Sequence, residues 1–222
     1  MNEEVMSNII NITEKYSNLP YMREKEALFL ADLIVENDLK DLLELGFFHG
    51  KSSIYFGSIL KGLGRGHLTT IDKSNSKDRN PNINQLLYDT DLEKYVTPIY
   101  AHRSFTWELA KMIRDGKKEV FDFCYLDGGH EFDTTMIAIS CLNILLKPGG
   151  ILVMDDLNYT VNNWPDTVLQ KKNYCDEERS SKSLNLIFEK VLPELGFKNL
   201  DTYYKNGNND GVGLAFGICR KK

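Results

Sequence analysis

The sequence contains few cysteines and no long apolar run, and these absences argue against several classes of protein. Its four cysteines form no C-x-x-C pair and are widely spaced, at Cys124, Cys141, Cys175 and Cys219. This spacing argues against a structural zinc site and favours a reduced, cytoplasmic protein. No stretch approaches the ~18 uncharged apolar residues of a membrane span. The first twenty residues also lack the apolar run of a secretory signal. We therefore expect no membrane partner.

A surplus of basic residues is also missing. The chain has 27 Lys and Arg against 32 Asp and Glu, a net charge of −5, so it lacks the positive field that neutralises nucleic-acid phosphates. We expect no nucleic-acid partner. With 222 residues, the chain is long enough for one good core but too short for two large domains. Residues 1–222 are therefore predicted to form a single domain.

Short apolar runs alternate with helical patterns through the middle of the chain. Strands are predicted at 41–45, 67–72, 96–101, 120–127 and 151–156, and helices at 52–63, 82–95, 104–116 and 133–146. Strands that are apolar on both faces, each followed by a helix, indicate a parallel sheet covered on both sides. The predicted fold class is α/β, with a doubly wound and mostly parallel sheet.

The two ends of the chain differ from this core of residues 41–156. Residues 5–36 show two helical patterns separated by Pro20, so residues 1–40 are predicted to form an N-terminal helical cap. Residues 157–182 are polar and irregular, and we expect them to be a substrate loop. Residues 183–222 are predicted to form a terminal helix and an antiparallel hairpin whose turn is KNGNNDG at 205–211.

The stretch ELGFFHGKSS at 44–53 is close to a phosphate-binding loop but departs from it. Gly46 and Gly50 are separated by three residues where the phosphate loop has four, which changes how backbone N–H groups wrap an anion. A carboxylate at Glu44 would repel a triphosphate and suits a ligand with a positive group. Asp72, at the end of the second predicted strand, could accept hydrogen bonds from ribose hydroxyls. Together these residues favour an adenosine ligand without a triphosphate, although a nucleotide-binding small-molecule kinase stays as an alternative.

These residues resemble the class I S-adenosylmethionine-dependent methyltransferases. The resemblance rests on ELGFFHGKS at 44–52, Asp72, FDFCYLDGGH at 121–130 and LLKPGGILVMDDL at 145–157, and it covers roughly residues 40–157. It implies a Rossmann-like, seven-stranded sheet of order 3-2-1-4-5-7-6 with helices on both faces. It also implies S-adenosyl-L-methionine as the cofactor.

The resemblance assigns cofactor contacts along the strand ends. Gly46 and Gly50 would let the backbone approach the methionine part, Glu44 would contact its amino group, and Asp72 would hold the ribose. The adenine would lie near Arg103 and Ser104, although the stretch AHRSF departs from the family pattern there. The remaining predicted cofactor contacts are Phe47, His49, Ser52 and Asp127.

Three carboxylates are predicted to meet at one edge of the sheet. Asp127 ends the fourth strand, and Asp155 and Asp156 end the fifth. Neighbouring strands lie ~4.8 Å apart, so these charges would repel one another unless a cation lay among them. Oxygen ligands suit Mg²⁺, and the spacing resembles the metal-dependent O-methyltransferases that act on catechols and macrolide sugars. The alternative is a solvated turn or a helix cap.

His130 follows Asp127 by three residues, across Gly128 and Gly129. In the metal-dependent relatives a basic residue at this spacing can take the proton from the acceptor hydroxyl, and an imidazole can do so near neutral pH. His130 and Asp127 are therefore the predicted catalytic residues. A helix cap or a surface histidine is the alternative role for His130, and His49 is the alternative base.

The resulting hypothesis is a Mg²⁺-dependent O-methyltransferase that acts on a small-molecule hydroxyl of a sugar, a catechol-like compound or another natural product. A metal-independent N-methyltransferase or other methyltransferase of the same fold is the alternative. We also expect that the N-terminal helices could pair two copies into a homodimer.

Overall fold

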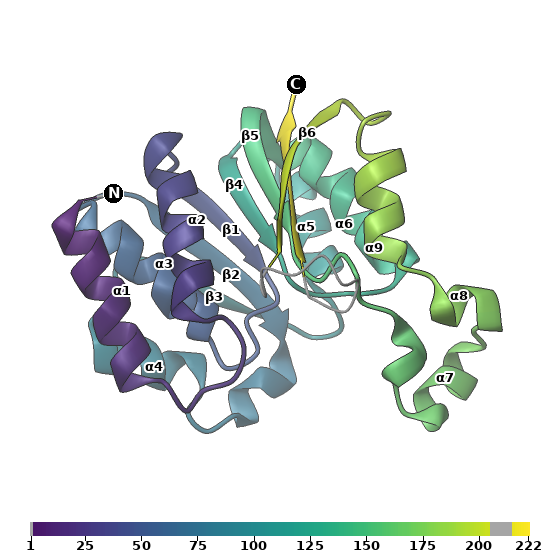
Figure 1. The fold of residues 1–222 in the computed structure, drawn as a ribbon, viewed down its shortest axis with the longest axis horizontal. Helices are drawn as coiled ribbons and strands as arrows, with labels where there is room; N and C mark the ends of the chain where they lie inside the picture. Colours follow the sequence, from purple (N-terminus) through teal and green to yellow (C-terminus); the bar gives the residue numbers. More distant parts are fainter. Residues whose placement is uncertain (1, 205–214) are drawn as a thin grey trace.

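The protein folds around one seven-stranded sheet, as seen in a computed structural model that describes residues 2–204 and 215–222 (Figure 1). The strand order is β3-β2-β1-β4-β5-β7-β6, as predicted. The strands β1 to β5 pair in parallel, and β7 runs antiparallel to both β5 and β6. The strand bounds are β1 Asp41–Leu45, β2 His67–Lys73, β3 Val96–Ala101, β4 Phe121–Leu126, β5 Leu146–Met154, β6 Phe197–Tyr204 and β7 Ala215–Lys221.

Helices cover both faces of this sheet (Figure 1). Those before β4 are α1 Glu3–Lys15, α2 Glu24–Glu36, α3 Lys51–Gly62, α4 Ile83–Thr90 and α5 Phe105–Arg114. After β4 come α6 Phe132–Leu145, α7 Asp166–Lys172, α8 Asp176–Ser180 and α9 Ser183–Leu186, which continues as a π-helical turn, Ile187–Val191. Short 3₁₀ turns lie at Ser74–Asp78 and Val161–Asn163.

Alternation along the strands divides the core into two parts. Leu42, Phe123 and Val153 face α1 to α4, while their neighbours Leu43 and Cys124 face α5, α6 and α9. Both sets are fully buried, as expected for parallel strands covered on two sides. The same alternation of side chains applies to the acidic residues that follow the strands.

Several element boundaries differ from the sequence prediction. The helix α4 ends at Thr90 rather than at residue 95, because Asp91 adopts a left-handed backbone conformation with φ of 55°. β5 begins at Leu146 rather than at residue 151, since Leu146 pairs with Phe121 across a register shift in β4. The segment 157–182 contains α7 and α8 rather than being wholly irregular. The predicted hairpin turn at 205–211 lies outside the described residues.

The N-terminal helices pack on the outside of the sheet, and their connection, together with Glu26 at the start of α2, reaches the cleft at the strand ends. Asn8 Nδ2 in α1 donates to the Ser58 carbonyl of α3 at 3.2 Å, and Val5 and Ile9 are fully buried. Residues 20–23, between α1 and α2, border the cleft described below. The segment predicted as a helical cap thus contains two helices, and the connection between them borders the cleft.

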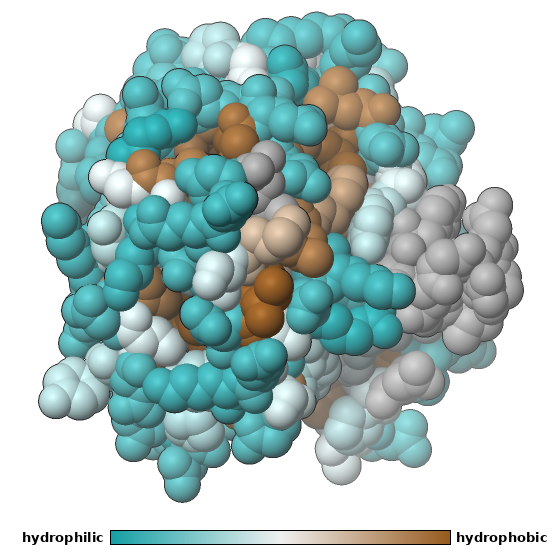
Figure 2. Space-filling view, turned by 60° about the vertical axis from the view of Figure 1, so that its left-hand side comes forward, coloured by the Kyte–Doolittle hydropathy of each residue, from teal (hydrophilic) through white to brown (hydrophobic). Residues whose placement is uncertain are grey.

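The described part of the chain has no helix with both the length and the apolar character needed to cross a membrane. On the face drawn in Figure 2, hydrophilic residues predominate and hydrophobic residues are visible only between them. This is the pattern expected where helices turn their polar sides to water.

Candidate active site

A cleft of about 840 Å³ opens beyond the carboxyl ends of the parallel strands. Residues that follow β1, β2, β4 and β5 line it, together with the connection between α1 and α2. In open α/β sheets, ligands bind at this edge, where the strand order reverses between β1 and β4. Nine of the predicted site residues line this cleft: Gly46, Phe47, His49, Ser52, Asp72, Asp127, His130, Asp155 and Asp156.

The two glycines of the loop after β1 are required by close packing within the chain. Gly46 has φ of 102°, and a Cβ there would lie 2.2 Å from the Asp127 carbonyl oxygen. Gly50 has φ of 103°, and a Cβ there would lie 2.7 Å from Ile83. Because a side chain fits neither position, the loop can turn tightly at the start of α3 and lie against the end of β4.

Asp72 holds this loop in place. Its Oδ2 accepts hydrogen bonds from the Phe47 N–H at 3.0 Å and the Phe48 N–H at 2.6 Å. Phe48 has φ of 51°, so these bonds stabilise a backbone conformation that few large residues adopt. Asp72 also borders the cleft, and its predicted contact with a ribose stays a prediction.

Glu44 is fully buried beneath the loop. It accepts hydrogen bonds from Ser53 Oγ and, at 2.5 Å, from Thr70 Oγ1, while its Oε1 has no partner among the described residues. Burial raises the pKa of Glu44 from its ordinary value of 4.5 to about 7, although the hydrogen bonds from Ser53 and Thr70 lower it. Glu44 is not among the residues that line the cleft, so its predicted contact with the amino group of the cofactor stays a prediction.

Lys51 begins α3, one residue before the predicted start of this helix, and its ammonium group is bonded within the chain. Nζ donates to the Leu19 carbonyl at 2.8 Å, and only 8% of the residue is exposed. Burial lowers the pKa of Lys51, and the nearby carboxylate of Glu26 partly offsets this. Lys51 therefore ties the connection before α2 to the glycine loop.

The predicted adenine residues lie back from the cleft wall. Ser104 Oγ accepts from the Thr106 N–H at 3.3 Å and caps the start of α5, which uses its hydroxyl within the chain. Neither Arg103 nor Ser104 is among the residues that line the cleft, whereas the adjacent Phe105 is. The aromatic ring of Phe105 is thus the contact that this turn offers.

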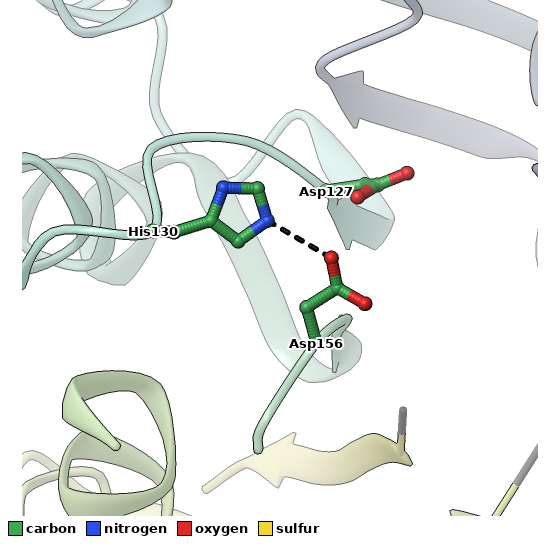
Figure 3. A group of neighbouring side chains, drawn as sticks. All are labelled: Asp127, His130 and Asp156. Atoms are coloured by element: carbon green, nitrogen blue, oxygen red, sulfur yellow. Dashed lines mark hydrogen bonds and ion pairs between the residues drawn. The ribbon is translucent and has the colours of Figure 1, made fainter. Parts of the chain in front are cut away.

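Asp127, His130 and Asp156 form a compact cluster at the ends of β4 and β5 (Figure 3). One ligand atom from each residue lies within 4.8 Å of the others, and all three residues are partly buried. His130 Nε2 lies 3.0 Å from Asp156 Oδ2. Asp156 has φ of 56°, which turns the chain sharply after β5. The cluster borders the same cleft as the glycine loop.

Asp155, the third carboxylate of the predicted metal site, faces a different partner. It is 3% exposed, accepts a hydrogen bond from Tyr125 Oη, and accepts one from the Asp156 N–H at 2.6 Å. Burial raises the pKa of Tyr125 well above its ordinary value, and the charges of Asp127 and Asp155 add to this effect. Tyr125 therefore stays protonated as the donor, and His130 takes the third place in the cluster.

His49, the alternative base, makes contacts with a different part of the chain from those of His130. Its Nδ1 lies 2.8 Å from the Pro81 carbonyl, which can only accept, so Nδ1 must carry a proton. Its ring also packs edge-on against Phe48 with centroids 4.7 Å apart. His130 instead lies beside two carboxylates, Asp127 and Asp156.

A family model described as a methyltransferase domain matches residues 43–157, from β1 to just beyond β5. The chain belongs to this methyltransferase family. This membership confirms the predicted class I S-adenosylmethionine-dependent methyltransferase and its enzyme class. Among curated proteins, none matches the chain.

Solved structures share the fold of this methyltransferase across its whole length. An O-methyltransferase from Bacillus cereus, in complex with S-adenosylhomocysteine, is 17% identical with a TM-score of 0.65; the match covers 100% of this chain and 92% of that one. The O-methyltransferase TomG from Streptomyces achromogenes, involved in tomaymycin synthesis and in complex with S-adenosylmethionine, is also 17% identical. Its TM-score is 0.65, and the match covers 100% of this chain and 91% of that one. At these identities the likeness shows the fold.

Phe105 and Arg79 line the cleft without having been predicted to, and Tyr125, the partner of Asp155, was not predicted either. Tyr125 precedes Asp127 by two residues, so strand alternation was a usable signal that both approach the same face. Phe105 follows the helix cap Ser104 and carries no motif. The guanidinium of Arg79 lies 3.6 Å from the centre of the Phe48 ring, a contact between segments that the sequence does not indicate.

Proposed function

We propose that this methyltransferase transfers the methyl group of S-adenosylmethionine to a hydroxyl of a small molecule, with Mg²⁺ as an essential ion. The observation that carries the proposal is the position of the Asp127, His130 and Asp156 cluster, which borders the same cleft as the glycine loop. Structural neighbours that are O-methyltransferases bound to S-adenosylmethionine or S-adenosylhomocysteine support it.

The donor set of the cluster fits a hard cation. Asp127 and Asp156 would supply one carboxylate each to Mg²⁺, which commonly keeps its remaining positions for water or substrate oxygens. When bound, the ion would lower the pKa of the acceptor hydroxyl. Asp155 stabilises the turn between these groups by accepting the Asp156 N–H.

His130 is proposed as the base that removes the hydroxyl proton. Asp156 Oδ2, 3.0 Å from Nε2, fixes one ring nitrogen, which leaves Nδ1 to receive the proton. Asp156 also stabilises the positive charge that the imidazole then carries. The remaining contribution of the chain is to hold the methyl carbon and the acceptor oxygen at reactive distance within the cleft.

The test is to incubate the protein with S-adenosylmethionine and a panel of catechols and sugar diols. Mass spectrometry would detect the methylated product and S-adenosylhomocysteine. We expect a product whose formation stops with EDTA and resumes with Mg²⁺. His130→Ala is expected to lower kcat by about 10²- to 10⁴-fold, the usual contribution of a general base.

Two results would replace this proposal with an alternative. Methylation that persists under full chelation would indicate a metal-independent methyltransferase of the same fold. Tight binding of Mg-ATP, with no stabilisation by S-adenosylhomocysteine, would indicate a nucleotide-binding kinase.

A further inference from the structure

The imidazole of His130 is held by two residues that follow β5. Besides the contact with Asp156, its ring packs against the ring of Tyr159, with centroids 4.3 Å apart and planes inclined by 38°. The Tyr159 N–H donates to the Asp156 carbonyl at 2.8 Å, so one tight turn sets both contacts. Tyr159 also lines the cleft.

Tyr159 is held in turn by an aromatic residue. Trp164 Nε1 donates to Tyr159 Oη at 2.8 Å, which fixes the far end of the tyrosine ring. The Trp164 ring packs edge-on against Tyr174, with centroids 6.3 Å apart and an interplanar angle of 74°. The position of Tyr159 therefore depends on a chain of contacts that extends through α7.

This chain of contacts returns to the residue next to His130. Tyr174 Oη and Lys172 Nζ both donate to Glu131 Oε1, and Lys172 also lies over the Trp164 ring. Glu131 is the residue that precedes α6, and only 11% of its side chain is exposed. These contacts link His130 to its neighbour Glu131 through four residues, which we name the aromatic clasp: Tyr159, Trp164, Lys172 and Tyr174.

We propose that Tyr159 is a positioning residue, which acts through the aromatic clasp to hold the imidazole of His130 toward the cleft. Within the proposed function, this makes Tyr159 a determinant of the turnover rate rather than of cofactor affinity. Tyr159 is the clasp residue that lines the cleft, so the segment that orients the proposed base also contributes to the cleft wall.

The first test reads the imidazole directly and needs no substrate. In ¹H–¹³C spectra, the ring of Tyr159 should shift the carbon-bound protons of His130 by its ring current. The sample would contain EDTA at alkaline pH, where imidazoles are neutral and protonation does not contribute. His130→Asn would assign the signal among the four histidines.

Two substitutions at Tyr159 separate the ring from its hydroxyl. Tyr159→Leu removes the ring, and we expect the His130 signals to move more than those of any other histidine. Tyr159→Phe keeps the ring but loses the bond from Trp164, and we expect a smaller move in the same direction. Tyr88→Leu, at a tyrosine that is 77% exposed on α4, is the matched control and should leave these signals unchanged. Unchanged His130 signals in a folded Tyr159→Leu variant would overturn the proposal.

The second test uses whichever acceptor the panel supplies. Tyr159→Leu should lower kcat by at least about tenfold with little change in the KM for S-adenosylmethionine, and Tyr159→Phe should retain more activity. An equal loss in both variants, or a change confined to KM, would contradict a positioning role. If no acceptor is methylated, the proposed function fails while the spectra still decide the role of Tyr159.

Discussion

Glu44 shows how a single buried carboxyl group can make the stability of a protein depend on pH. Its pKa is raised to about 7 by burial, so the folded protein binds a proton that the unfolded chain releases above pH 4.5. Stability from this group is therefore fully present below pH 4.5 and is lost as pH rises through 7. The shift corresponds to a loss on the order of 3 kcal/mol in the free energy of unfolding.

We expect the ligand-free protein to lose thermal stability relative to Glu44→Gln between pH 4.5 and 7. The variant keeps a neutral group in the same place, so it should lack this part of the pH dependence. Thermal unfolding measured at several pH values checks the prediction. Asp176→Asn, at a fully exposed carboxylate, is the control and should follow the wild type. Parallel curves for the wild type and Glu44→Gln would show that Glu44 does not titrate in this range.

The carboxylates after β4 and β5 differ in their partners, so they should differ in metal affinity. Titration calorimetry with Mg²⁺ is expected to show affinity reduced more than about 100-fold in Asp127→Asn and Asp156→Asn. Asp155→Asn can still accept from Tyr125, and we expect a loss of less than about tenfold, as for a group outside the ligand set. Equal losses in all three variants would restore Asp155 as a ligand.

At the scale of elements, the sequence predicted β1 and β3 to the residue, because each is a short run bounded by a clear change of pattern. The extension of β5 back to Leu146 was not predictable, since Pro148, Gly149 and Gly150 are typical of turns and only the pairing with β4 extends the strand. The short helices α7 and α8 carry too few residues for a periodic signal.

Some contacts of the candidate site could be predicted from the sequence, and others could not. Asp127, His130 and Asp156 could be predicted to meet, because the ends of adjacent parallel strands lie at one edge. The separate contacts of Asp155 could not be predicted, because Asp127 and Asp155 continue the same face as Tyr125 and Val153, and only side-chain orientation distinguishes them. The contact of Tyr159 with His130 could not be predicted, because it depends on side-chain orientations in two separate segments.

The link between α3 and the N-terminal connection gives a prediction at this scale. Lys51→Met keeps the apolar stem but removes the donor to the Leu19 carbonyl, and losing such a bond in a buried site destabilises by about 1 to 3 kcal/mol. We expect faster amide hydrogen exchange in residues 19–23 and a lower unfolding temperature.

The matched control for this substitution is Lys25→Met, on the exposed side of α2. It should change neither measurement, because Lys25 lies outside the contact with Leu19. Exchange in residues 19–23 that stays at the wild-type rate in Lys51→Met would mean that the connection is held by its other contacts alone.

At the scale of the whole molecule, two cores on opposite faces of one sheet support a single cleft at its edge. The face with α1 to α4 carries the glycine loop, and the face with α5, α6 and α9 carries the helix that follows His130. Under the proposed function, the cofactor and acceptor sites would therefore draw on opposite faces of the sheet, which meet between β1 and β4.

The contact of Gly46 with the Asp127 carbonyl joins these halves at the level of the backbone. No atom separates the turn that would seat the donor from the strand end that would carry the ion. Occupancy of either place should therefore change the other, and thermodynamic linkage requires the two effects to be equal. We expect S-adenosylhomocysteine to raise the affinity for Mg²⁺ by the same factor by which Mg²⁺ raises the affinity for S-adenosylhomocysteine, measured by reciprocal calorimetric titrations. If neither ligand changes the affinity for the other, the contact between Gly46 and Asp127 does not couple the two sites. If both affinities rise by the same factor, the close backbone contact that the absence of a side chain at Gly46 permits would couple binding of the donor to binding of the ion.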